Sequence, residues 1–130
     1  MTTPYREHVL DHYRNPRNRG TLDYPDVVQE LDNPVCGDTV RIELRLEGDR
    51  VIDARFTGRG CVISIAAASM LTEAIKGKAL KELREMTDDD ALALLGVPLG
   101  AVRVKCGLLP LRTLQKGLEQ IKTHDTRRLE

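Results

Sequence analysis

The sequence contains no tryptophan, one phenylalanine and three tyrosines among 130 residues. Proteins that bind single-stranded nucleic acid stack bases on aromatic rings, and this chain has few rings to offer. Its 20 Lys and Arg are balanced by 20 Asp and Glu, so its net charge draws it neither to nucleic acid nor to an anionic membrane. We therefore expect no nucleic-acid partner and a core built mainly from aliphatic side chains.

Long apolar runs are also missing. No segment reaches the roughly 20 apolar residues of a membrane-spanning helix, and residues 1–7 lack the apolar stretch of an export signal. We expect a cytoplasmic protein without a membrane partner. A length of 130 residues suits one domain. We assign residues 1–130 to that domain and expect residues 1–4 and 124–130 to be flexible.

Cysteine is scarce, with only Cys36, Cys61 and Cys106 in the chain. An odd, small number of thiols argues for reduced cysteines that act as ligands or nucleophiles, rather than for a disulfide framework. Their spacing fits no local zinc motif, so a shared site would have to be assembled from distant segments. Glycine or proline near each cysteine implies turns that bring backbone close to the sulfur. The alternative is three buried thiols packed as small hydrophobic side chains.

Two periodicities predict an α+β fold with a small three-stranded antiparallel sheet and about five helices. Apolar residues at helical spacing predict a first helix that ends near Arg14. A first strand is predicted near residues 27–31. Strict alternation then predicts a hairpin in which Val40, Ile42, Leu44 and Leu46, and Ile52, Ala54 and Phe56 on the return strand, point inward, with charged residues between them facing solvent.

Four more helices are expected after the hairpin. The first covers residues 62–75 and is apolar on nearly every side. A short helix is expected at residues 80–83, and another begins after the capping residue Thr87 and continues through Leu95. The last helix ends near Thr123. The last helix should begin near Cys106, because Pro110 is tolerated in a first turn. Cys61 and Cys106 would then both lie at helix N-termini, where the helix dipole stabilises a thiolate.

The hairpin places Cys36 just before one strand and Cys61 just after the next, so both can lie at one edge of the sheet. Asp38 is the obvious fourth ligand if the sulfurs converge. Three thiolates and a carboxylate can hold zinc, and the same thiols suit an iron–sulfur cluster. The carboxylate is the hardest of these donors and would be the replaceable one. Alternatively, Asp38 is a turn residue that bonds its own backbone.

Other polar residues near these motifs have plainer interpretations. Lys105 could lower the pKa of Cys106 or attract an anionic persulfide, but a solvated lysine is the commoner case. The same applies to Arg59 and Arg103. His8 and His12 stand four apart, a spacing found in helical metal pairs, yet no third ligand accompanies them and an ordinary solvated or hydrogen-bonded pair is favoured. His124 lies in the polar tail and is expected to have no special role.

Several separated motifs occur together and in order between Tyr5 and Gly117. They are Asp11-His12-Tyr13-Arg14-Asn15-Pro16-Arg17-Asn18, Asn33-Pro34-Val35-Cys36-Gly37-Asp38, Gly58-Arg59-Gly60-Cys61-Val62-Ile63-Ser64 and Lys105-Cys106. With these motifs the chain resembles the IscU/SufU family of iron–sulfur cluster assembly proteins, which includes the N-terminal domain of NifU.

The resemblance implies an α+β fold and a ligand set of Cys36, Asp38, Cys61 and Cys106, with the three thiols also holding a cluster. Members of the family accept sulfur from a pyridoxal-phosphate cysteine desulfurase, and either build a transient 2Fe-2S cluster for apo-proteins or relay the sulfur onward; many bind zinc (Zn²⁺). Cys36 and Cys106 are the candidate sulfur acceptors.

Two departures bear on the subgroup. Lys105 stands where IscU has histidine, as in SufU, but the chain lacks the insertion between the second and third cysteines that is typical of SufU. The Leu-Pro-Pro-Val-Lys chaperone motif of IscU is replaced by Leu99-Gly100-Ala101-Val102-Arg103. Three functions stay open: a non-enzymatic cluster scaffold and sulfur acceptor, a zinc-dependent sulfurtransferase that activates the desulfurase, and a structural zinc domain used for binding.

Overall fold

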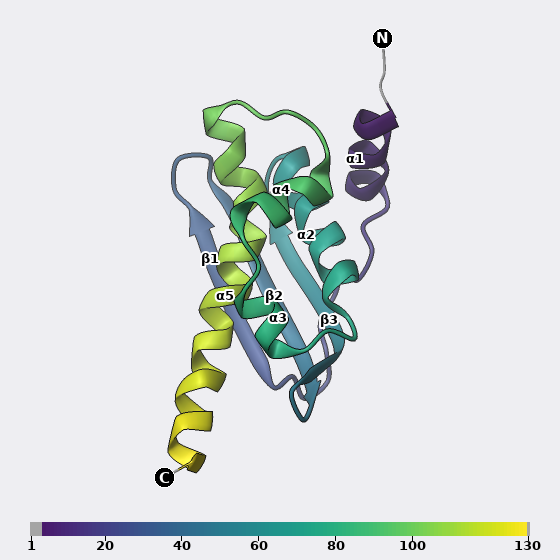
Figure 1. Cartoon of the computed structure of the whole chain (residues 1–130). Helices are drawn as coiled ribbons and strands as arrows, with labels where there is room; N and C mark the ends of the chain where they lie inside the picture. The colour runs from purple at the N-terminus through teal and green to yellow at the C-terminus, as the bar shows by residue number, and fades with distance from the viewer. Residues whose placement is uncertain (1–3, 130) are drawn as a thin grey trace.

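A computed structural model describes residues 4–129, which form a three-stranded antiparallel sheet and five helices (Figure 1). The predicted α+β class and the predicted numbers of strands and helices are confirmed. In chain order the elements are α1 (Pro4–Arg14), β1 (Val27–Asn33), β2 (Asp38–Glu47), β3 (Arg50–Arg59), α2 (Val62–Ile75), α3 (Leu80–Arg84), α4 (Asp88–Leu95) and α5 (Ala101–Leu129).

The helices cover one face of the sheet, whose strand order is β1-β2-β3 (Figure 1). Helix α5 packs on β1 and β2, and α2 packs on β3 and α5, while α1 packs mainly on α2. Strand β1 ends, β2 begins and β3 ends at the same end of the sheet, since Asn33 pairs with Asp38 and Thr39 with Arg59. The loops at this end therefore lie close together in space.

The core is aliphatic, as the composition predicts. Phe56 is fully buried on β3 beside Ile42 of β2, and the other large side chains that are fully buried are Leu, Ile and Val. Helix α2 is buried along most of its length, including Ala66, Ala67, Ala68 and Ser69, which agrees with its nearly uniform apolar pattern. Small side chains on α2 let it pass between the sheet, α1 and α5.

Two details of the predicted hairpin are wrong. Ile52 is 49% exposed, because a bulge between Arg45 and Leu46 leaves Ile52 without a partner on β2 and turns Val51 inward instead. Glu43, expected on the solvent face, is 3% exposed because the loop after α1 covers it. Its carboxylate accepts the Leu22 amide at 2.8 Å and the Arg41 guanidinium at 2.9 Å, which compensates for its burial.

Helix α5 starts at Ala101, five residues earlier than predicted, so Pro110 lies inside it. Proline has no amide hydrogen, and the helical bond from residue 110 to the Cys106 carbonyl cannot form. The helix continues because Leu109, Leu111 and Leu114 are buried on its inner face, and this packing outweighs a cost of about 3 kcal/mol for an internal proline. Cys106 is consequently in the second turn and not at the helix N-terminus.

The C-terminal part of α5 also exceeds the prediction, since the helix runs to Leu129 rather than ending near Thr123. Residues 1–3 and 130 lie outside the described part of the chain, and the flexibility expected of both ends stays a prediction. Within residues 4–129, none of the helices combines the length and the apolar character needed to cross a membrane.

A polar seam joins α1 and the following loop to α2. His12 is 2% exposed, and its Nδ1 lies 2.8 Å from the Ser69 hydroxyl, which also accepts the Arg17 amide. Asn18 donates to the Thr72 hydroxyl at 3.3 Å. Because the Ser69 oxygen accepts from Arg17, its own hydrogen is free for His12, and this arrangement suits a neutral imidazole.

Lowering the pH is expected to destabilise this seam. Burial lowers the pKa of His12 below its usual value of 6.5, and the nearby charges of Arg17 and His8 lower it further. The stability that neutral His12 contributes is present above the unfolded pKa and is lost as pH falls through the folded pKa. We expect the urea midpoint of the metal-free protein to be lower near about pH 5.5 than near about pH 7.5.

His12→Gln should shrink that difference, because glutamine does not titrate. His8→Gln, which removes an exposed ring from the same helix, should leave most of it. An equal pH dependence in the parent and the His12 variant would show that the buried imidazole is not its source.

Candidate metal centre

The three cysteines come from three elements that meet at one end of the sheet. Cys36 lies in the turn between β1 and β2, Cys61 is the N-cap of α2 directly after β3, and Cys106 lies in α5. The turn at Cys36 closes because Gly37 adopts a left-handed φ of 76°, a conformation that side chains disfavour. The predicted location of Cys36 and Cys61 at the same edge is therefore confirmed.

Four side chains converge there. The Cys36 and Cys106 sulfurs are 3.4 Å apart, and each residue of the trio Cys36, Asp38 and Cys106 offers a ligand atom within 4.8 Å of the others. Cys61 joins this trio through Asp38, since its sulfur is 3.8 Å from Asp38 Oδ2. Within the described residues, the trio is the one group of three or more His, Cys, Asp or Glu side chains close enough to hold a metal ion.

Asp38 faces inward, although aspartate is seldom buried. It is 2% exposed at the start of β2, and its Oδ1 accepts the Cys61 amide hydrogen at 3.2 Å. The carboxylate therefore holds the start of α2 in place. The alternative interpretation, in which Asp38 hydrogen-bonds the backbone of its own turn, is not what the structure shows. Its second oxygen faces the Cys61 sulfur, which leaves an oxygen donor available beside the thiols.

Gly60 permits this close approach of Asp38. A Cβ at position 60 would lie 2.6 Å from Asp38 Oδ1 and would also overlap the Ser64 hydroxyl. The glycine in the Gly58-Arg59-Gly60 motif is therefore needed for space beside the carboxylate. The glycines of this motif were expected to bring backbone close to a sulfur, and the structure shows that Gly60 instead approaches the carboxylate.

Gly60→Ala is expected to push the Asp38 carboxylate out of place and to weaken zinc binding roughly tenfold to a hundredfold, the range seen when a group that supports a ligand is lost. Competition with a chromophoric zinc chelator measures the effect. Gly100→Ala is the matched control, because a Cβ on Gly100 meets no atom within 4 Å. If both variants bind zinc as the parent does, the packing at Gly60 has no bearing on the centre.

Two residues that support the centre were missed by the sequence analysis. Asn33 is 7% exposed, and its backbone carbonyl accepts from the amides of Cys36 and Gly37, while its side-chain nitrogen lies 4.0 Å from the Cys106 sulfur. Ser64 is fully buried, and its hydroxyl donates to the Cys61 carbonyl at 3.2 Å. Asn33 and Ser64 stand in the recognised motifs, but nothing in their spacing pointed to these bonds.

The electrostatics of Cys106 differ from the prediction. Burial raises the pKa of its thiol strongly, and interactions with Asp38, Cys36 and Cys61 raise it further. A lower pKa was expected from a helix N-terminus, but Cys106 lies inside α5. Lys105 is exposed, which agrees with the favoured interpretation of a solvated lysine. A bound metal cation would take the place of the thiol protons, and its positive charge would offset the cost of placing several negative groups side by side.

His8 and His12 are not part of the centre. His8 is exposed, His12 is bonded to Ser69 on α2, and their rings meet edge to face at 4.7 Å. The hydrogen-bonded interpretation of this pair is supported. The side chain of His124 lies outside what the structure describes. Arg59 and Arg103 are exposed.

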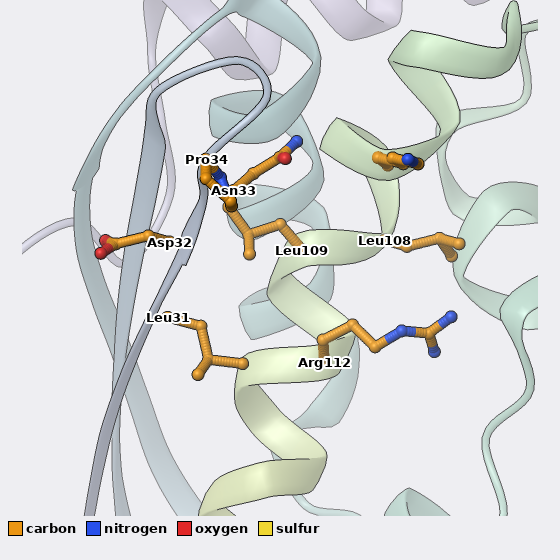
Figure 2. Close-up of a pocket in the computed structure, with 8 residues that line it drawn as sticks. Leu31, Asp32, Asn33, Pro34, Leu108, Leu109 and Arg112 are labelled. Atoms are coloured by element: carbon orange, nitrogen blue, oxygen red, sulfur yellow. The ribbon is translucent and has the colours of Figure 1, made fainter.

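A groove of about 320 Å³ runs beside the centre between the end of β1 and α5 (Figure 2). Its lining includes the apolar side chains of Leu31, Leu108 and Leu109 and the charged side chains of Asp32, Lys105 and Arg112. In Figure 2, Leu31 and Leu109 lie between β1 and α5, whereas Asp32 points away from α5 and Leu108 and Arg112 point away from β1. Lys105, the residue before Cys106, is one of the residues that line this groove.

The donors present fit a soft or borderline metal ion. Three thiolates and one carboxylate match the number and type of ligands that tetrahedral zinc takes, and thiolates are the usual ligands of iron–sulfur clusters. The chemistry of this donor set and the space left by Gly60 beside the Asp38 carboxylate both agree with such a group. Cys36, Asp38, Cys61 and Cys106 would hold it.

Fold and centre together define a small α+β domain with a thiolate–carboxylate site, and comparisons with known proteins specify its family. Residues 4–128 match the model of the NifU-like N-terminal domain. The chain belongs to this family, and the resemblance to IscU/SufU proteins is confirmed.

Named relatives fall on both sides of the IscU/SufU division. The chain is 41% identical to the zinc-dependent sulfurtransferase SufU of Bacillus subtilis (strain 168), over 91% of each chain. It is 33% identical to the iron–sulfur cluster assembly scaffold protein IscU of Escherichia coli (strain K12), over 92% of this chain and 94% of that one.

A solved structure gives the same result. The chain from Fervidobacterium islandicum AW-1, described as a candidate iron–sulfur cluster assembly scaffold for the SUF system, superposes with a TM-score of 0.74 at 29% identity. The match covers 86% of this chain and 94% of that one. Sequence and fold therefore agree on the family.

Proposed function

We propose that this protein takes part in iron–sulfur cluster assembly by accepting sulfur from a cysteine desulfurase and by holding or relaying it for apo-proteins. The convergence of one exposed thiol, two more enclosed thiols and a buried carboxylate supports this proposal most strongly. A purely structural zinc domain is disfavoured, because the sheet and α2 already bury a continuous aliphatic core that does not depend on the centre.

Cys36 is the better candidate for the first sulfur acceptor. It is exposed in the turn after β1, whereas Cys106 is 1% exposed and its thiol pKa is raised by burial. The Cys36 thiolate would attack the outer sulfur of a persulfide on the desulfurase. A new sulfur–sulfur bond forms on Cys36, the donor's sulfur–sulfur bond breaks, and the desulfurase cysteine leaves as a thiolate.

Cys106 is placed to receive the sulfur next. Its own sulfur is 3.4 Å from that of Cys36, within reach of a second exchange of the same kind. Asp38 and Cys61 would then lie beside the transferred sulfur. Asp38, as the hard oxygen donor, would be the ligand most easily exchanged when cargo leaves.

A zinc-dependent sulfurtransferase is the second candidate. The 41% identity to a protein of that name favours it, as does an exposed lysine at position 105 in place of a further nitrogen ligand. In that case the centre would keep zinc, whose positive charge stabilises thiolates, and Cys36 would pass sulfur on without a cluster being formed.

Anaerobic reconstitution distinguishes the candidates. The protein is incubated with iron, cysteine and a desulfurase, and its visible spectrum, metal content and bound persulfide are measured before and after addition of an apo-acceptor. Stable cluster absorbance that passes to the acceptor supports the scaffold, and retained zinc with labelled persulfide supports the relay. Absence of both cluster and persulfide on the protein would contradict the proposed function.

A further inference from the structure

Three arginines line a second cavity beside the metal centre. This cavity of about 400 Å³ lies where α1 ends, β3 ends and α2 begins, and it is lined by Tyr13, Arg14, Arg19, Gly58, Arg59, Gly60 and Ile65. Arg14, Arg19 and Arg59 are all exposed, and Tyr13 is 40% exposed. We call these three side chains the arginine cluster.

Among the side chains that the structure describes, the arginine cluster lacks the acidic partners that four other arginines of this chain have, and unlike Arg45, Arg50 and Arg103, which also have none, its members line one cavity together. Arg17, Arg41, Arg55 and Arg112 pair with Asp11, Glu43, Asp53 and Asp88, respectively. Among the side chains of residues 6–121, no carboxylate lies within ion-pair distance of Arg14, Arg19 or Arg59, and the Arg19 side chain bonds only the Gly58 carbonyl at 3.3 Å. In a chain of zero net charge, this concentration of uncompensated positive charge calls for an anionic ligand.

The cavity also adjoins the side of the centre where Asp38 lies. Gly60 belongs to both, because it lines the cavity and packs against the Asp38 carboxylate. The next residue, Cys61, is the N-cap of α2, and its side chain makes no capping bond. A molecule held by the arginine cluster would therefore lie next to the ligand that we expect to exchange during release.

We propose that the arginine cluster docks an acidic segment, with two or three neighbouring Asp or Glu residues, on the protein that takes cargo from this centre. Guanidinium groups form paired hydrogen bonds with carboxylates, and arginine clusters are a recurrent means of recognising acidic motifs. The partner's role rests on the proposed function, but its binding chemistry does not.

The exposure of the cluster favours a protein segment over a small anion. Sites that retain a small ion usually surround it with buried donors, whereas these guanidinium groups stand at the surface, where they steer and orient a large partner. Nucleic acid is less favoured, because three cations and one lining ring fall short of the six to ten phosphate contacts that are common in DNA complexes.

Binding of a fluorescein-labelled hexaglutamate peptide tests the proposal by fluorescence anisotropy. We expect binding that weakens as salt rises toward ~0.15 M. Combining Arg14→Gln, Arg19→Gln and Arg59→Gln should weaken it roughly tenfold or more, since each lost ion pair contributes a few-fold. Arg14→Gln with Arg59→Gln should give a smaller loss and keeps the bond from Arg19 to Gly58 if the triple variant folds poorly.

A matched control removes the same charge at the far end of the sheet. The control variant combines Arg50→Gln, Lys78→Gln and Lys81→Gln, three positions near the β2–β3 turn and the start of α3. It should change the affinity for the peptide by less than about twofold. Absence of binding to the parent, or equal losses in the two triple variants, would overturn the proposal.

Competition with two other ligands tests whether the cavity instead binds a small anion or a nucleic acid. Inorganic phosphate that displaces the peptide at equal or lower concentration would show a small-anion site instead, and tighter binding of a single-stranded oligonucleotide would show a nucleic-acid surface. The peptide experiment is run on the metal-free Cys61→Ser variant as well, where binding should persist. A failure of cargo transfer would then contradict the proposed function while leaving the docking result intact.

Discussion

Serine in place of Cys61 is expected to weaken zinc binding by at least about a hundredfold, the upper end of the loss seen when only a supporting group is removed. Cys61 contributes a sulfur 3.8 Å from the Asp38 carboxylate, and a serine hydroxyl stays protonated where a thiol ionises onto a metal. Serine fits the half-buried N-cap of α2 without clash, so the fold should survive.

Stability measured with and without zinc makes this prediction quantitative. At free zinc of about one hundred times its Kd, the parent should gain about 2.7 kcal/mol, and the Cys61 variant should gain almost nothing at the same zinc concentration. The metal-free forms should unfold at similar urea concentrations. Equal zinc retention by the two proteins would show that Cys61 is not a ligand.

Removal of the Asp38 carboxylate should slow the release of cargo. With Asp38→Ala, three thiolates remain and the exchangeable oxygen donor is gone, so a reconstituted cluster should persist longer and pass to an apo-acceptor more slowly, by roughly tenfold. The same change also leaves the Cys61 amide without its acceptor, which should cost about 1–3 kcal/mol of stability.

Asp38→Asn separates these two effects. Its side-chain oxygen can still accept from the Cys61 amide, so the stability should stay close to that of the parent, but an amide is a poorer metal ligand than a carboxylate. We therefore expect slow transfer in both variants and a lower urea midpoint only in the alanine variant. Parent-like cluster lifetime and transfer rate in both would limit Asp38 to a structural bond.

Much of this architecture follows from local patterns. Alternation along β2 and β3 predicted the hairpin, and with it the meeting of Cys36 and Cys61 at one end of the sheet. Thr87 and Asp90 form the capping box that starts α4, as the sequence indicates. These features depend on residues that are neighbours in the chain, and for that reason they could be read from it.

Features that depend on distant packing were predicted less well. The start of α5 was misplaced because the penalty for Pro110 was weighed without the buried leucines that carry the helix past it. The bulge that exposes Ile52 leaves no mark in an alternating pattern. The bond from Asp38 to the Cys61 amide, across 23 positions, could be inferred only once the strands were paired.

The central claim is that Cys36, Asp38, Cys61 and Cys106 hold one metal ion, and zinc X-ray absorption spectroscopy tests it most directly. We predict three sulfur scatterers at about 2.3 Å and one oxygen scatterer at about 2.0–2.2 Å. Asp38→Ala should alter only the oxygen shell, and Cys61→Ser should reduce the sulfur count. A parent spectrum with two or fewer sulfurs, or with imidazole scattering, would contradict this ligand assignment.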